Sequence, residues 1–119
     1  MTRQAAMNEA LTYLADARYH RVFHLASRTP SHQRRDKRFR VTYSDIGRPA
    51  CENEDEEAGK ATVFFCGGLF AGRWFGACIK ADLVLKARGV RLINIDRPGM
   101  GGTDEVSLSE RLNVFMGTL

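Results

Sequence analysis

Two glycine-rich turns contain the residues whose types and spacing could support chemistry. The first turn, Gly67–Gly72, follows the apolar run Ala61–Cys66, and the second, Pro98–Gly102, follows the apolar run Val90–Ile95. Glycine lets the backbone turn sharply and come close to a ligand, so both turns could offer N–H groups to an oxyanion or a phosphate. The rest of the chain has to position these two turns.

A parallel βαβ unit would bring both turns to one place. The two apolar runs are separated by a stretch with helical spacing, which is typical of parallel strands joined by a crossover helix. We predict this helix over Arg73–Arg88, with Gly89 as a left-handed C-terminal cap. Its predicted buried side chains are those of Trp74, Ile79, Leu83 and Leu85. Ligands of parallel sheets bind beyond the carboxyl ends of the strands, where both glycine turns fall.

The first turn has the glycine spacing of a P-loop, Gly67-x-x-x-x-Gly72. A P-loop needs a lysine for the β- and γ-phosphates and a serine or threonine for magnesium at the next two positions. Arg73 and Trp74 occupy these positions, and tryptophan cannot bind a metal. A phosphate or nucleotide site through Gly67–Arg73 is therefore the less favoured hypothesis.

Three segments, in order, resemble the N-terminal third of the α/β-hydrolase family of the AB hydrolase-1 type. They are Val41–Gly47 (VTYSDIG), Val63–Leu69 (VFFCGGL) and Asp96–Thr103 (DRPGMGGT). The strongest is the D-x-P-G-x-G-x-[ST] run after an apolar strand, and the resemblance covers about Phe39 to Leu119. It implies an α/β fold: a partial hydrolase-like sheet with an N-terminal helix and edge hairpin, then a βαβ unit and a terminal helix.

The resemblance also implies roles for the glycine turns. The turn after the strand Ala61–Cys66 would supply a backbone N–H of an oxyanion hole at Leu69, following Gly67 and Gly68. Many family members have histidine at the position of Gly67. In the second turn, Asp96 would organise the loop by accepting backbone N–H groups. The other implied organising residues are Arg97, Gly99 and Gly101.

The family's nucleophile is absent from the chain. No serine lies in a G-x-S-x-G elbow, and the only histidines, His20, His24 and His32, precede the βαβ unit. An oxyanion donor without a nucleophile and a base cannot form an acyl-enzyme, so we assign no catalytic residue. The resemblance implies a chain truncated before the nucleophile elbow: a piece of a serine hydrolase for small ester or amide-like substrates, inactive alone.

A second hypothesis is a non-catalytic interaction fragment. By family topology the missing nucleophile strand would pair with Val63–Cys66, whose edge would then be exposed. Such an edge could bind a full-length relative or a second copy of this chain.

The remaining secondary structure is predicted from periodicity. Met7, Leu11 and Leu14 suggest an amphipathic docking helix over Ala5–Tyr19. The run Val22–Leu25 and the alternating segment Phe39–Ser44 could form an antiparallel edge hairpin. The alternation predicts that Phe39, Val41 and Tyr43 are buried and that Arg40, Thr42 and Ser44 face water. A capping box of Ser107 and Glu110 predicts a final helix.

Charge and composition divide the chain into two parts. Residues 1–36 are expected to form the N-terminal helix and a basic linker, and residues 37–119 the hydrolase-like portion, with an acidic surface loop at 50–60. Nine of the eighteen Lys and Arg residues lie between Arg3 and Arg40, whereas Glu52–Glu57 carries five acids. The basic segment has no interleaved aromatic residues, so we predict no nucleic-acid partner.

Cysteine usage and hydropathy indicate the compartment. Cys51, Cys66 and Cys78 are odd in number and lack C-x-x-C spacing, which argues against disulfides and a zinc site. No segment has the length and hydropathy of a membrane span. We therefore expect a cytoplasmic protein with no metal, no cofactor and no membrane partner.

Overall fold

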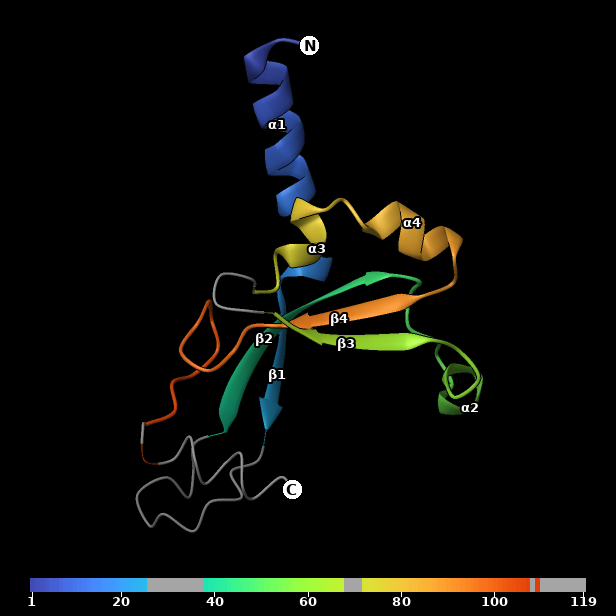
Figure 1. The fold of residues 1–119 in the computed structure, drawn as a ribbon, viewed down its shortest axis with the longest axis vertical. Coiled ribbons are helices and arrows are strands. Elements are labelled where there is room, and N and C mark those ends of the chain that lie inside the picture. Colours follow the sequence, from blue (N-terminus) through green and yellow to red (C-terminus); the bar gives the residue numbers. More distant parts are fainter. Residues whose placement is uncertain (26–37, 68–71, 108, 110–119) are drawn as a thin grey trace.

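The computed structural model describes residues 1–25, 38–67, 72–107 and 109 of the chain (Figure 1). The helices are α1 (Arg3–Leu14), the 3₁₀ turn η1 (Ala17–Tyr19), α2 (Glu54–Glu57), α3 (Phe75–Cys78) and α4 (Asp82–Ala87), and the strands are β1 (Arg21–Leu25), β2 (Phe39–Gly47), β3 (Thr62–Cys66) and β4 (Arg91–Ile95). The fold is of the α/β class and is built on one mixed four-stranded sheet. No helix formed by the described residues is long and apolar enough to cross a membrane.

The strands lie in the order β1-β2-β4-β3. The predicted hairpin is present, because β1 pairs with β2 in antiparallel register from Arg21 opposite Tyr43 to Leu25 opposite Phe39. The two predicted parallel strands, β3 and β4, are neighbours, and β2 runs antiparallel to β4. β1 therefore belongs to the sheet although it precedes residue 36, where the sequence suggested the end of the N-terminal part.

One face of the sheet, which we call the covered face, packs against η1, α3 and α4. The buried core on this side consists of Tyr19, Ile46, Ala77 and Leu92. The Tyr19 ring stacks on Trp74 with centroids 5.8 Å apart, and its hydroxyl donates to that of Tyr13 at 2.7 Å. Aromatic packing thus joins the end of α1 and η1 to the start of α3.

The face assignment for β2 was wrong except at Arg40, which is exposed as predicted. The period of two is present, but the most buried side chains are those of Thr42, Ser44 and Ile46, whereas Phe39, Val41 and Tyr43 are only half-buried. Hydrogen bonds from the loop after β4 bring Thr42 inside, and η1 and the helices cover that face. Residue hydropathy alone could not reveal this, because the cover comes from other segments.

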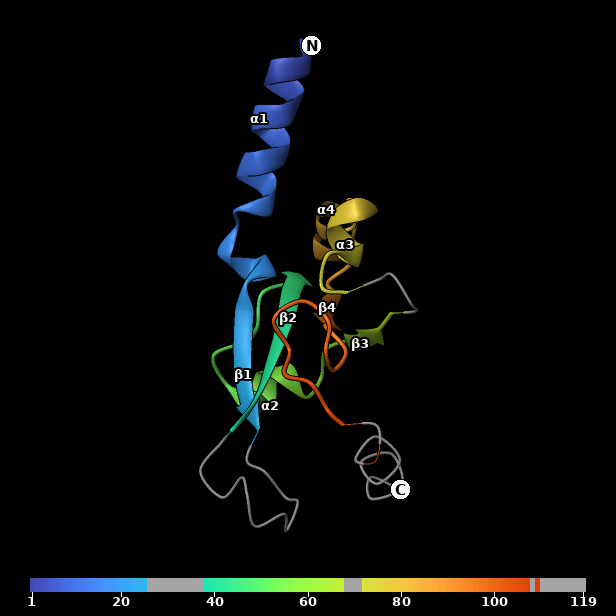
Figure 2. The ribbon, with the colours of Figure 1, turned by 90° about the vertical axis from the view of Figure 1, so that its left-hand side faces the viewer.

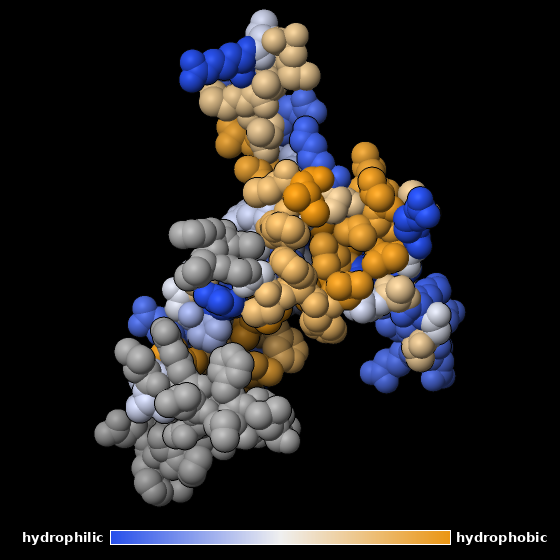
Figure 3. All heavy atoms as spheres, in the orientation of Figure 1, coloured by the Kyte–Doolittle hydropathy of each residue, from blue (hydrophilic) through white to orange (hydrophobic). Residues whose placement is uncertain are grey.

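We call the opposite face of the sheet the open face. It contains an apolar groove of about 450 Å³. Its lining residues are Phe23, Leu25, Val41, Tyr43, Phe64, Arg91, Ile93 and Ile95. Phe64 is 73% exposed and Phe23 54%. Apolar side chains are also exposed on the helices, where Ile79, Leu83 and Val84 contribute to the apolar surface over α3 and α4 (Figure 3).

The single helix predicted over Arg73–Arg88 is two short helices. The chain breaks at Lys80, which has a φ of 49°, and α4 begins at Asp82. Asp82 Oδ1 accepts the N–H of Gly47 at 2.7 Å and the Arg18 guanidinium at 3.1 Å, so long-range bonds determine where α4 starts. The break changes the helical phase. Trp74 and Leu85 pack against the core as predicted, but Ile79 and Leu83 are exposed. Gly89 adopts the predicted left-handed conformation, with a φ of 67°.

The N-terminal helix is shorter than predicted, since α1 ends at Leu14. Asp16 then accepts the N–H of Arg18 at 2.9 Å and begins η1. Both views of the ribbon show α1 projecting away from the sheet (Figures 1 and 2), and none of its residues is buried. Only Tyr13, at the end of α1, packs against the described core, and the predicted docking residues Met7, Leu11 and Leu14 are exposed.

The acidic segment contains α2 and is held in place. Glu57 accepts two hydrogen bonds from the Arg48 guanidinium, at 2.8 and 3.1 Å, and the Thr62 hydroxyl also donates to it. The Arg48 guanidinium holds the pKa of Glu57 well below its ordinary value. The expected surface loop is thus joined to the start of β3.

Candidate functional site

The carboxylate of Asp96 lies within a hydrogen-bonded cluster at the carboxyl end of β4. It is 3% exposed. Its Oδ1 accepts the backbone N–H of Arg73 at 2.8 Å, and its Oδ2 accepts the Arg73 guanidinium at 2.6 Å and the Thr42 hydroxyl at 2.5 Å. A buried carboxylate requires such donors, because an unpaired charge away from water is costly. Asp96 therefore joins β2 and the segment before α3 to the end of β4.

Thr103 extends this arrangement into the second glycine turn. Its hydroxyl donates to the main-chain oxygen of Asp96 at 2.9 Å and accepts the N–H of Thr42 at 3.0 Å. The Thr42 hydroxyl oxygen also accepts the N–H of Gly102 at 3.2 Å. We call Thr42, Arg73, Asp96 and Thr103 the Asp96 cluster. Three of its members come from segments far apart in the sequence, so it holds Arg73, which follows the first turn, and the second turn in place relative to β2.

Two glycines are required beside this carboxylate. A Cβ atom on Gly72 would collide with Oδ1 of Asp96, and one on Gly101 would collide with Oδ2. Gly101 also has a φ of +54°, which residues other than glycine rarely adopt. One glycine of each turn therefore approaches the same carboxylate closely.

The first turn begins next to Asp96. Cys66 pairs with Ile95 across the parallel strands, so Gly67 and Asp96 leave the sheet as neighbours, and Gly67 is buried. Gly68 and Leu69, which the resemblance assigned to the oxyanion hole, lie outside the described residues.

The second turn, to which the resemblance assigned the organising residues, is a compact loop. The N–H of Met100 donates to the carbonyl of Arg97 at 2.9 Å, and the N–H of Gly99 donates to the carbonyl of Asp104 at 3.1 Å. The side chain bound to Asp96 is that of Arg73, and within the described residues no hydrogen bond joins Arg97 to this carboxylate.

Sequence reasoning missed Thr42, Arg73 and Thr103 as cluster members. Thr103 is the last position of the D-x-P-G-x-G-x-[ST] run, and this position was the available signal. Arg73 was considered only as a phosphate ligand, and Thr42 was assigned to the solvent face. Neither residue carries a local pattern that indicates a distant carboxylate.

The Asp96 cluster positions backbone segments, but it contains no nucleophilic side chain paired with a general base. The guanidinium of Arg73 is engaged by Asp96 and lies 4.8 Å from the centroid of the Trp74 ring. His20 Nε2 is 2.8 Å from the carbonyl oxygen of Leu14, and in the described part of the chain no histidine ring is hydrogen-bonded to a serine or cysteine. The same residues contain no group of His, Cys, Asp or Glu that could hold a metal ion. This arrangement can orient N–H donors but cannot by itself cleave an acyl bond.

Comparison of the chain with protein-family models, with curated proteins and with solved structures found no match.

Proposed function

We propose that this chain forms the oxyanion side of an α/β-hydrolase-type domain. The domain would cleave small ester or amide-like substrates by serine chemistry in the cytoplasm. The nucleophile, acid and histidine would come from polypeptide outside these 119 residues, and the chain alone would be inactive. The chain's own residues would hold the loop whose backbone N–H groups stabilise the oxyanion.

The Asp96 cluster is the observation that carries this proposal. Asp96 begins the D-x-P-G-x-G-x-[ST] run, and the run's terminal Thr103 bonds back to the Asp96 main chain. Together they fix a glycine of each turn at the carboxyl end of the parallel pair. Preorganised N–H donors at this edge are what an acyl-transfer site needs before substrate arrives.

The strand arrangement also supports the proposal. The resemblance implied an edge hairpin, neighbouring third and fourth strands, and a next strand that pairs with the third. The order β1-β2-β4-β3 meets the first two conditions and leaves β3 as the last strand of the described sheet. A further strand could therefore add to β3 without displacing one already present.

The test has two parts. A fluorophosphonate probe should leave the 119-residue chain unlabelled, and labelling of any of its serines would overturn the proposal. The transcript should then be read beyond the codon for Leu119. We expect an open frame that encodes G-x-S-x-G followed later by a histidine, whereas an in-frame stop at that point would exclude the hydrolase proposal.

An interaction fragment is the second candidate, and the exposed edge favours it. Val63 and Phe64 on β3 are 46% and 73% exposed, and the strand carries no charge or proline that would oppose pairing. The candidate partners are a second copy of this chain and a full-length relative. No observation favours the phosphate hypothesis at Gly67–Arg73, because the Arg73 guanidinium is bound to Asp96.

A further inference from the structure

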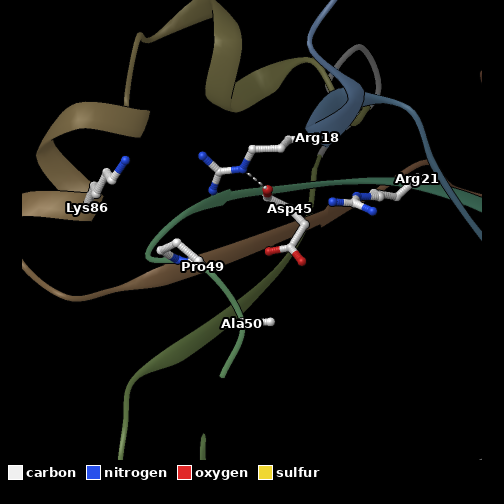
Figure 4. A pocket seen from close by; sticks show the side chains of 6 residues that line it. All are labelled: Arg18, Arg21, Asp45, Pro49, Ala50 and Lys86. Atoms are coloured by element: carbon white, nitrogen blue, oxygen red, sulfur yellow. Dashed lines mark hydrogen bonds between the residues drawn. The ribbon is translucent and has the colours of Figure 1, made fainter. Parts of the chain in front are cut away.

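A second pocket lies at the opposite end of the sheet from the glycine turns. It has a volume of about 470 Å³, and its lining residues are Arg18, Arg21, Asp45, Pro49, Ala50 and Lys86 (Figure 4). Asp45 lies near the end of β2, opposite Ile93 of β4, whereas the glycine turns follow the far ends of β3 and β4. The proposed hydrolase function uses none of these lining residues.

Arg18 forms a fixed wall of the pocket. β1 pairs with β2 only as far as Tyr43, so the last residues of β2 have no strand beside them on that side. The Arg18 guanidinium fills this place: Nε donates to the Asp45 carbonyl and Nη2 to the Gly47 carbonyl, both at 2.8 Å. Nη1 donates to the Asp82 carboxylate at 3.1 Å. An arginine held by three acceptors keeps its position before any ligand arrives.

The carboxylates near the pocket already have cationic partners. Asp45 binds Arg91 through two hydrogen bonds, at 2.9 and 2.7 Å. Asp82 is paired with Arg18, and Glu57 with Arg48. The carboxylate of Asp45 therefore does not compensate the charges of Arg21 and Lys86.

Two cationic side chains that line the pocket have no anionic partner among the described residues. Arg21 and Lys86 form no side-chain hydrogen bond or ion pair with any described residue. They approach from different elements, Lys86 from α4 and Arg21 from β1, and the Arg18 guanidinium lies between them in Figure 4. Since each carboxylate named above is neutralised by its own arginine, the pocket carries an excess of two positive charges.

We propose that this pocket binds a small oxyanion with two negative charges, of the phosphate or phosphomonoester class. Two unpartnered cations match a dianion in charge, and guanidinium groups bind oxyanions through pairs of parallel N–H donors. The pocket volume is within the usual range for small-ligand sites, roughly 300–1,000 Å³. Pro49 and Ala50 supply an apolar wall against which the organic group of a monoester can lie.

Titration of the whole chain with inorganic phosphate and with phenyl phosphate tests this site, at ionic strength held constant with chloride. We expect saturable binding by calorimetry, with amide shifts in the NMR spectrum at Arg21, Gly47 and Lys86. Arg21→Gln and Lys86→Gln should each weaken binding about 10-fold or more, the cost of losing a charged hydrogen bond. Tighter binding of phenyl phosphate than of inorganic phosphate identifies the monoester as the ligand class, and equal binding identifies the phosphate group alone.

Arg3→Gln is the matched control, because it removes one positive charge from exposed α1, outside the pocket. It should bind phosphate as the unmodified chain does. The proposal is overturned if neither compound binds saturably, if the two pocket variants bind normally, or if Arg3→Gln loses as much affinity as they do. Thermal unfolding in chloride alone checks that all three variants fold. None of these outcomes depends on hydrolase activity, so the site and the proposed function can fail separately.

Discussion

Asp96 and Thr42 illustrate how single polar residues determine the loop geometry. Both are buried, and both make their bonds to segments distant in sequence. By contrast, the hydroxyl of Ser44 and the side-chain amide of its neighbour Asn94 are buried without a hydrogen-bond partner among the described residues. The same strand therefore offers a bonded and an unbonded hydroxyl on one face.

Thr42→Val should destabilise the fold by about 1.5–3 kcal/mol, because it removes a hydroxyl bound to a buried carboxylate while keeping the side-chain shape. Ser44→Ala is the control and should change stability by less than about 0.5 kcal/mol or increase it, since its hydroxyl has no bond to lose. Urea denaturation measures both. Equal losses in the two variants would show that the Asp96 cluster does not stabilise the fold.

Tyr19 makes stability sensitive to alkaline pH. Burial, with a smaller contribution from the hydrogen bond to Tyr13, raises the pKa of Tyr19 well above its ordinary value of 10.0. The unfolded chain therefore loses this proton first, so the contribution of Tyr19 to folding is complete below pH 10 and falls as the pH rises above it.

Tyr19→Phe cannot titrate and should lose less stability between pH 8 and pH 11 than the unmodified chain, measured by urea denaturation at each pH. Tyr43→Phe, on the open face, controls for the general effect of alkali. Parallel losses in the unmodified chain and Tyr19→Phe would contradict the assignment.

Among the elements, α1 and the pair α3 and α4 differ most from the helices that hydrophobic periodicity predicted. α1 has twelve residues and buries none of them, although Thr2 caps it by accepting the N–H of Ala5 at 3.2 Å. Isolated helices shorter than about 12–15 residues are marginal in water. Within the described residues, the end of α1 is held by Tyr13, which packs against the core, and by His20, whose ring lies 2.8 Å from the carbonyl oxygen of Leu14.

Hydrogen exchange followed by mass spectrometry should therefore detect little protection in α1 and strong protection in β2 and β4, which lie inside the sheet. The peptide covering β2 serves as the internal reference. Protection of α1 equal to that of β4 would mean that another molecule covers this helix in solution.

In the described part of the molecule one sheet face is well covered, and the sheet ends in two edge strands, β1 and β3. The described core is small, and the apolar open face continues to β3, which has no second neighbouring strand among the described residues. An exposed strand of this kind is a template for pairing with another chain.

Val63→Lys should reduce concentration-dependent association in sedimentation velocity, because a lysine on an edge strand opposes strand pairing. Val84→Lys is the matched control: it places the same charge at an exposed valine of α4, outside the sheet. If the unmodified chain remains monomeric at every concentration, or if both variants reduce association equally, β3 is not the site of pairing.

Local patterns were sufficient for the parallel strands, the hairpin and the left-handed cap at Gly89. Alternation, apolar runs and glycine preferences depend on neighbours along the chain, so the sequence determined them by itself. The position of Asp96 directly after an apolar strand could also be predicted from the sequence alone. Its bonding partners could not be derived in this way.

Tertiary structure decided which face of β2 is buried, where α4 begins and which arginine binds Asp96. Each depends on groups brought together across many residues: Thr103 with Thr42, Asp82 with Gly47, and Arg73 with Asp96. Buried polar side chains must find partners wherever the fold supplies them. Periodicity carries no information about that choice, because it records the hydropathy of a residue and not the group that will face it.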